Sequence, residues 1–244
     1  MTKDFTLIKY KELLNALDDY GRVTLRHDVD KKPKNSLATA YIERELGWKA
    51  TYYFRAVPES WDESVILQIA SLGHDIGYHY ESLTTCHGNI EAAYDDFCRN
   101  LERLRALVPV STISMHGSPR SKWDSRDLWK HYDYHLLGIE TEPYLDTDFS
   151  KVFYLTDTGR RWDGFNVSVR DKIPEYQNLW ISQGLVYHTT DDVIRAVGEG
   201  TFPRNVLLNT HPQRWTDRRI PWVKELVLQY AKNLVKRAIV KNNS

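Results

Sequence analysis

Short apolar or β-branched runs alternate along the chain with longer segments whose apolar residues recur at helical spacing. The short runs, which predict strands, are residues 23–25, 50–54, 74–79, 111–115, 136–139, 152–155 and 206–209. The longer segments, which predict amphipathic helices, are residues 7–17, 37–46, 65–72, 89–107, 191–197 and 221–234. Up to residue 115 helices and strands alternate, and this order predicts parallel βαβ units and an α/β fold.

Local signals refine these helices. Ser60 and Glu63 have the spacing of a capping box, and Thr190 is placed to cap the helix that follows it. The last helix is expected to bury Trp222, Leu226, Tyr230 and Leu234. Residues 156–172 are rich in Gly, Asp and Arg and are expected to form a loop. No repeat or linker divides the sequence, so we expect one domain over residues 1–244.

Ionisable residues follow the apolar run of almost every predicted strand. The first strand continues into Arg26, His27, Asp28 and Asp30, and later strands lead into Arg55, His79, Glu81, His116, Asp157 and His211. The carboxyl ends of parallel strands meet at one rim, where active sites of α/β proteins lie. Buried ionisable groups are costly unless paired or metal-bound, and a His/Asp/Glu set without thiolates suits Zn²⁺ or another divalent transition metal. The alternative is a structural ion-pair network in which Arg26 neutralises Asp28.

Composition narrows the class of protein. The chain has 244 residues, and its 33 Lys and Arg balance its 33 Asp and Glu, which argues against nucleic acid as a partner. Cys86 and Cys98 match no zinc-finger or redox spacing, so a reducing compartment is expected. No apolar stretch resembles a signal peptide or a transmembrane segment, and we expect a soluble, cytoplasmic protein.

The polar strand ends resemble the motifs of the polysaccharide deacetylase (NodB-homology, carbohydrate esterase) superfamily. Residues 25–30 resemble its first motif in the Asp-x-Asp form, and residues 73–79 resemble its Gly-His-Glu-Ile-Gly-x-His motif. Residues 116–119 stand where a motif ending in proline occurs, Asp157 with Trp162 resembles an Asp…Trp element, and residues 207–212 resemble the closing Leu-x-His motif. The resemblance runs from about residue 20 to residue 215. It implies a metal-dependent hydrolase on a distorted (β/α) barrel of about seven strands.

Two departures from the motifs mark a divergent branch. The superfamily has a second metal-binding histidine four residues after the position of His79, where this chain has Leu83. Glu81 is the nearest replacement ligand, because a carboxylate is acceptable to Zn²⁺, and His87 is an alternative that could fold back. His116 stands in place of the arginine of the third motif, which helps to orient the base.

By resemblance, Asp28 would be the general base and Asp30 a metal ligand together with His79. His211 would protonate the leaving amine, while His116 and Asp157 would complete the catalytic set. His74 would orient Asp28 or its strand. Zn²⁺ is the first choice of metal, with Co²⁺, Ni²⁺ and Fe²⁺ as alternatives.

The expected substrate is an N-acylated sugar, either free or as a nucleotide- or lipid-linked precursor, from which an acetyl or formyl group is removed. Arg55, Trp162 and Trp215 are the candidate substrate-binding residues, with Trp123 as a further ring for stacking on a sugar. Loop arginines that could hold a phosphate or carboxylate are Arg120, Arg160, Arg161, Arg214, Arg218 and Arg219. Two alternatives stay open: a catalytically silent carbohydrate-binding relative, and a hydrolase of a non-sugar C–N bond.

Overall fold

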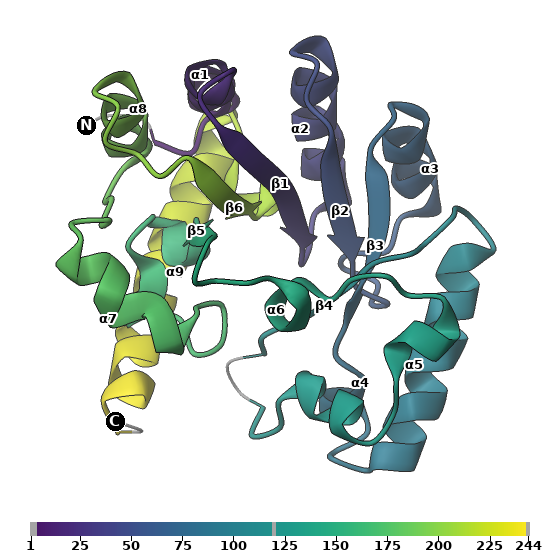
Figure 1. The fold of residues 1–244 in the computed structure, drawn as a ribbon. Coiled ribbons are helices and arrows are strands. Elements are labelled where there is room, and N and C mark those ends of the chain that lie inside the picture. The colour runs from purple at the N-terminus through teal and green to yellow at the C-terminus, as the bar shows by residue number, and fades with distance from the viewer. Residues whose placement is uncertain (1–3, 119–120, 243–244) are drawn as a thin grey trace.

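Six parallel strands form one curled sheet, in the spatial order β4-β3-β2-β1-β6-β5, in this computed structural model (Figure 1). The structure describes residues 4–118 and 121–242, with side chains described as far as residue 233. The strands are β1 (Arg22–Val29), β2 (Ala50–Phe54), β3 (Asp75–Tyr80), β4 (Ile113–Met115), β5 (Phe153–Thr156) and β6 (Asn205–Thr210). The α/β class and the parallel pairing expected from the sequence are confirmed, and the sheet forms a half-barrel consistent with a NodB-like fold.

Within the described ranges the strand count is six, not about seven, because residues 136–139 are not a strand. They overlap the 3₁₀ helix η2 (Tyr134–Leu137), which begins where the Asp133 side chain accepts a hydrogen bond from the His135 amide. Gly138 ends it in the left-handed region at φ 68°. Leu136 is 84% exposed, so this apolar pair of leucines does not mark a buried strand.

Helices that connect successive strands, among them α2, α3 and α5, pack along the outside of the curled sheet (Figure 1). The described helices are α1 (Leu7–Leu17), α2 (Pro33–Glu45), α3 (Glu63–Ser71), α4 (Ser82–Thr85), α5 (Ile90–Arg105), α6 (Pro143–Asp146), α7 (Pro174–Ser182), α8 (Thr190–Gly198) and α9 (Arg219–Asn242). Two caps differ from expectation, since Asp62 caps α3 and Thr189 caps α8. The predicted loop over residues 156–172 contains the 3₁₀ helices η3 (Thr158–Arg160) and η4 (Gly164–Asn166). No described helix is both long enough and apolar enough to cross a bilayer.

The last helix, α9, turns a different face to the protein than its sequence predicts. Among the side chains of α9 that the structure describes, Glu225 and Gln229 are buried, whereas Leu226 and Tyr230 are exposed. The reason is the ion pairing of Glu225, whose carboxylate lies 3.2 Å from the Lys31 amine and 2.9 Å from the Lys32 amine. The expected burial of Leu234 concerns a side chain outside the described part.

The two faces of β1 are polar in different ways. Arg26 and Asp28 point to the inner face of the curled sheet, where the Arg26 guanidinium donates to Ser114 Oγ on β4 over 2.6 Å. His27 points to the outer face, toward α2. Because β2 and β3 lie between β1 and β4, a contact between Arg26 and Ser114 requires the sheet to curl.

A buried polar network joins β1 to the helix layer. The Glu43 carboxylate of α2 accepts hydrogen bonds from the Tyr10 hydroxyl over 2.6 Å and the Tyr52 hydroxyl over 2.8 Å, and it lies 2.9 Å from His27 Nε2. His27 Nδ1 in turn is 2.7 Å from Thr210 Oγ1 on β6. Burial and the charge of Glu43 raise the pKa of both tyrosines, so their hydroxyls stay protonated and donate.

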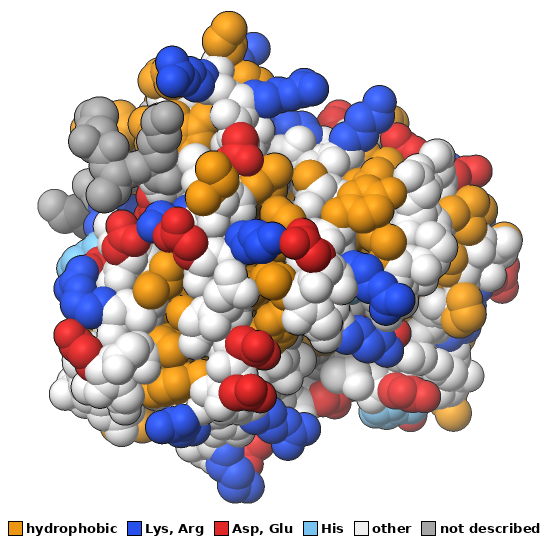
Figure 2. Space-filling model, turned by 90° about the horizontal axis from the view of Figure 1, so that it is seen from above, with side chains coloured by type: hydrophobic (Ala, Val, Ile, Leu, Met, Phe, Trp, Pro, Cys, Tyr) orange, Lys and Arg blue, Asp and Glu red, His pale blue; other side chains and the backbone are white. Residues whose placement is uncertain are grey.

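The surface seen in Figure 2 carries a mixture of side-chain types. Acidic and basic side chains are interspersed there with apolar ones, and neither sign of charge dominates. This agrees with the balanced composition of the whole chain.

We expect Glu43→Ala to lower the free energy of unfolding by about 3–5 kcal/mol, because it leaves buried hydrogen-bonding groups without their shared partner. Urea denaturation followed by circular dichroism measures the loss. Glu45→Ala is the matched control on the same helix, since Glu45 makes only an exposed pair with Lys11 at 2.6 Å. We expect it to cost less than about 0.5 kcal/mol. Equal losses for the two variants would contradict a structural role for the network.

Candidate metal and catalytic site

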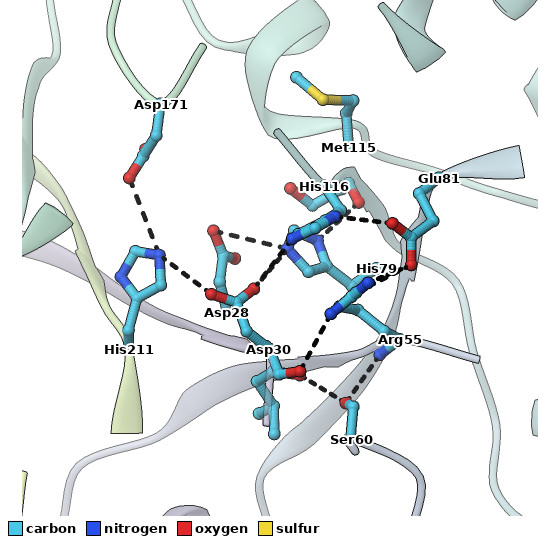
Figure 3. Close-up of polar contacts among 12 residues, drawn as sticks. Asp28, Asp30, Arg55, Ser60, His79, Glu81, Met115, His116, Asp171 and His211 are labelled. Carbon is cyan, nitrogen blue, oxygen red and sulfur yellow. Dashed lines mark hydrogen bonds and ion pairs between the residues drawn. The ribbon is translucent and has the colours of Figure 1, made fainter. Parts of the chain in front are cut away.

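One aspartate and two histidines converge at the carboxyl ends of β1, β3 and β4 (Figure 3). One ligand atom from each of Asp30, His79 and His116 lies within 4.8 Å of the other two. Asp30 Oδ1 is 3.7 Å from His79 Nε2 and 3.5 Å from His116 Nε2. A carboxylate and two imidazole nitrogens facing one point fit a catalytic zinc site, which uses three protein ligands and leaves a position open.

Hydrogen bonds fix how the two imidazoles face Asp30. His79 Nδ1 is 2.9 Å from the carbonyl oxygen of Ser114, which can only accept, so Nδ1 carries the proton. His116 Nδ1 is 2.9 Å from a Glu81 carboxylate oxygen. Both rings therefore direct Nε2 toward Asp30, the orientation that a metal ligand needs.

Glu81, the expected third ligand, lies outside this group of three. Its carboxylate is held by the Arg55 guanidinium, over 2.9 Å from Nε and 2.5 Å from Nη2, as well as by His116. Burial alone would raise the pKa of Glu81, but the hydrogen bond from His116 and the charge of Arg55 lower it to about 2. Glu81 therefore orients a histidine of the group, and Arg55, expected to bind substrate, orients Glu81.

The second histidine of the group is His116 and does not come from the position of Leu83. Leu83 is buried in α4, whereas His116 reaches the group from the end of β4. The other alternative, His87, packs near Trp123 with 6.0 Å between ring centres and is not in the group. Pro119 and Arg120, which belong to the same stretch as His116 in the sequence, lie outside the described residues.

Asp28 is clamped beside this group. Its carboxylate accepts from Arg26 Nη2 over 2.5 Å and from Asn209 Nδ2 over 2.8 Å, and it lies 3.9 Å from His79 Nε2. Burial opposes ionisation, but the charges of Arg26, His79 and His211 outweigh it and lower the pKa of Asp28. Asp28 is thus an ionised carboxylate with a fixed orientation. The Arg26–Asp28 pair expected in the alternative interpretation is present and lies within the site.

Arg26 is itself held in place by aromatic rings. Its guanidinium carbon lies 4.8 Å from the centre of the Tyr53 ring and 5.2 Å from that of Tyr144. The orienting arginine of this site therefore comes from β1, two residues before the carboxylate that it holds.

His211 approaches from the other side, at the end of β6. Its Nδ1 is 2.7 Å from the Asp157 carboxylate, which also accepts from Arg214 Nη1 over 2.6 Å and Trp215 Nε1 over 2.8 Å. Burial alone would raise the pKa of Asp157, but the charges of Arg214 and His211 lower it. Burial and Arg214 would lower the pKa of His211, but Asp157 and Asp30 raise it. The pair leaves His211 Nε2 directed into the site, 4.0 Å from Asp30 Oδ2.

Asp171, which no sequence motif marks, is part of the same pocket. Asp171 accepts hydrogen bonds from the hydroxyls of Tyr144 over 3.0 Å, Thr156 over 2.8 Å and Tyr154, and it lies 3.9 Å from His211 Nε2. It stands in a loop without periodicity, so only its charge could have marked it. The tyrosine and threonine side chains that hold it are far away in sequence.

A small cavity of about 100 Å³ connects these groups. Its lining includes Asp28, Asp30, His79, His116, Asp171, His211 and Arg214. A larger cavity of about 760 Å³ opens near the start of the strands, with Thr24, Thr51 and Asp75 in its wall. We assign the site to the smaller cavity, because the converging carboxylates and imidazoles line it and because sites in this fold class lie at the carboxyl ends of strands.

The two tryptophans expected to stack on a sugar are buried. Trp215 is 1% exposed and donates to Asp157, while Trp162 is 4% exposed and donates to Thr190 Oγ1 over 3.0 Å. Neither lines the small cavity. Their indole groups support the loops around His211 and offer no open ring face to a substrate.

The remaining candidates are dispersed. Arg214 lines the cavity, whereas Arg161 pairs with Asp163 at 2.6 Å and Arg218 is exposed. His74 contacts the carbonyl of Ala40 at 3.0 Å, on the helix side of the sheet, so it holds the strand rather than Asp28.

The sequence of the chain shows little similarity to known proteins. No family model matches the chain, and no curated protein matches it. Among solved structures, it is similar to PdaA of Bacillus subtilis, described as a family 4 carbohydrate esterase, with 12% identity, 89% of each chain covered and a TM-score of 0.36. A likeness at this level carries no argument about activity.

Substitutions at Glu81, the ligand expected from the sequence, and at His116, which lies in the group of three, test the candidate metal site. We expect His116→Ala to abolish stoichiometric binding of Zn²⁺, because it removes one of three ligands. Glu81→Gln should keep the ion and weaken its binding by about 10–100-fold, because Glu81 only orients His116. Isothermal titration of the metal-free protein measures both, with exposed His131→Ala as the control. The reverse result, full binding by His116→Ala and none by Glu81→Gln, would show that Glu81 binds the metal and His116 does not.

Proposed function

We propose that this protein is a metal-dependent hydrolase that removes an N-acyl group, acetyl or formyl, from a sugar or a sugar-containing precursor. The observation that carries the proposal is the placement of two proton-handling groups next to different members of the ligand group. Asp28 lies 3.9 Å from the ligand nitrogen of His79, and His211 lies 4.0 Å from the carboxylate of Asp30. Hydrolysis of an amide needs a base for water and an acid for the leaving amine, both within reach of one bond.

Asp30, His79 and His116 would hold the metal. When bound, a divalent ion there would acidify a water molecule and polarise the substrate carbonyl. Asp28 is ionised and fixed by Arg26 and Asn209, so it accepts a proton from the attacking water. The water oxygen forms a C–O bond to the acyl carbon, and the C–N bond then breaks.

His211 supplies the proton that the departing nitrogen requires. Asp157 holds Nδ1 and raises the pKa of His211, so that Nε2 carries a proton toward the pocket. The amine leaves protonated and the acyl group leaves as a carboxylic acid, so the atoms of one water molecule are accounted for. Without this proton the nitrogen would have to leave as an amide anion, which is a very poor leaving group, so His211 is essential for amides.

The structure of the ligand group favours an enzyme over a catalytically silent binding protein. The silent alternative rested on Leu83, which removes the second histidine of the motif. His116 completes the group without it. The sugar substrate is supported by the resemblance of the motifs, and the cytoplasmic setting and a nucleotide or lipid linkage remain predictions from the sequence.

Removal of the metal is the first test. We expect chelation to abolish release of acetate or formate from N-acylated aminosugars, and Zn²⁺ or Co²⁺ to restore it. Release is measured directly in the reaction mixture. Full activity after chelation, with the metal content checked, would exclude a metal-dependent mechanism, whereas a protein that binds sugars but never releases acid would be the silent relative.

Substitution of the acid and base is the second test. We expect Asp28→Asn and His211→Ala to retain metal and to lose about 10²-fold or more in kcat, because each removes one proton transfer. His211→Ala should hurt an N-acetyl amide more than an aryl acetate, whose leaving group needs no proton. Asp148→Asn, at an exposed carboxylate, is the control. An equal loss on both substrates would show that His211 is structural.

A further inference from the structure

The outward face of α9 is apolar, although the helix is not covered by any described part of the chain there. Ile220 is 82% exposed, Val223 51%, Val227 62% and Tyr230 68%. These residues recur at the spacing i, i+3, i+7 and i+10, so they form one stripe along the helix. Glu225 and Gln229, which face the protein, lie on the opposite side. We call the four exposed residues the α9 stripe.

The charge of α9 differs from that of the rest of the chain. Residues 219–242 contain six Lys or Arg and a single acidic residue, Glu225, in a chain with equal numbers of the two signs. The remainder therefore has five more acidic than basic residues. Glu225 is buried against Lys31 and Lys32, so it does not offset the basic charge at the surface. The helix thus combines an exposed apolar stripe with a strongly basic composition.

We propose that α9 binds peripherally to a bilayer surface that contains anionic lipid, with the α9 stripe inserted among the lipids. Basic amphipathic helices bind in this way, through buried apolar area and attraction to anionic headgroups. Lys224 is exposed on the turn after Ile220 and can reach headgroups while its stem lies along the apolar surface. Tyr230 has the apolar ring and polar hydroxyl that suit the boundary between lipid and water.

Charge complementarity favours lipid over a second copy of this chain. A coiled-coil seam between two helices is stabilised by opposite charges on its flanks. Two copies of α9 would bring basic flanks together without an exposed acidic partner, and they would repel. An anionic surface attracts the same charges.

Contacts of α9 tie the stripe to the candidate site. Lys31 and Lys32, which pair with Glu225, follow Asp30 directly in the chain. Asn233 donates to the carbonyl of Gly159 over 2.9 Å, two residues after Asp157. A protein docked through the stripe would therefore hold both site loops against the side of α9 that faces away from the lipid. The proposal itself does not depend on catalysis, because vesicle binding needs neither substrate nor metal.

Cosedimentation with vesicles tests the proposal. We expect the full chain to bind vesicles of phosphatidylcholine with about a third phosphatidylglycerol at least about tenfold more strongly than pure phosphatidylcholine. Binding should fall at ~0.5 M salt, where charges are screened. Equal binding to both vesicles, or no binding to either, would overturn the proposal.

Three variants separate the parts of the surface. We expect Ile220→Ser with Val227→Ser to weaken binding about tenfold or more through lost apolar area, and Lys224→Glu to do so through lost charge. Lys224→Glu changes an exposed side chain, so it tests the charge without endangering the fold. Leu136→Ser is the control, because Leu136 is 84% exposed on η2. Full vesicle binding by both α9 variants would contradict the proposal. So would a parent dimer that the double serine variant converts to a monomer, because the stripe would then be a protein interface.

Discussion

The ion pair between Arg26 and Asp28 is the constraint on which the rest of the structure depends. Both side chains are buried on the inner face of a central strand, where an isolated charge would cost several kcal/mol. Each needs partners that β1 cannot supply, namely Ser114 on β4 and Asn209 on β6. Asn209 lies on the strand that pairs directly with β1, but Ser114 lies three strands away and can reach Arg26 only if the sheet curls. The curl is therefore coupled to the pairing of a buried charge as well as to the packing of apolar side chains.

The same curl assembles the candidate site. His79 and His116 come from strands on one side of β1, and His211 comes from the strand on the other side. Their orientation depends on groups outside the pocket: a backbone carbonyl for His79, Glu81 for His116, and Asp157 for His211. Each of these partners can accept a hydrogen bond, so each holds a proton on Nδ1 and directs Nε2 inward. All three histidines thus share one arrangement, in which an acceptor binds Nδ1 and Nε2 faces the pocket.

The sequence predicted what periodicity and chain order encode, and missed what depends on curvature. Residues 7–17 and 50–54 are the bounds of α1 and β2, because local spacing determines them. Which of Glu81 and His116 faces Asp30 depends on where the ends of β3 and β4 lie relative to β1 in the curled sheet, and no spacing in the sequence encodes that placement. Asp171 was missed for the same reason, since the hydroxyls that hold it come from segments apart in the chain. The burial of Trp215 follows from its bond to Asp157, which is also a long-range contact.

The helix α9 shows a different limit of sequence patterns. An apolar stripe predicts the side of a helix that packs on the core, because burial of apolar area is the usual driving force. In α9 the ion pairs of Glu225 outweigh this preference. Lys31 and Lys32, which follow Asp30, neutralise Glu225, and the side of the helix that carries Glu225 therefore faces the protein. The buried charge of Glu225 is neutralised by two lysines. The apolar area of the exposed stripe, in contrast, is not covered by any described part of the chain. Uncovered apolar area is costly in water, so the arrangement is most stable when a surface of another kind covers it. The basic charge of the helix makes an anionic surface the complementary one.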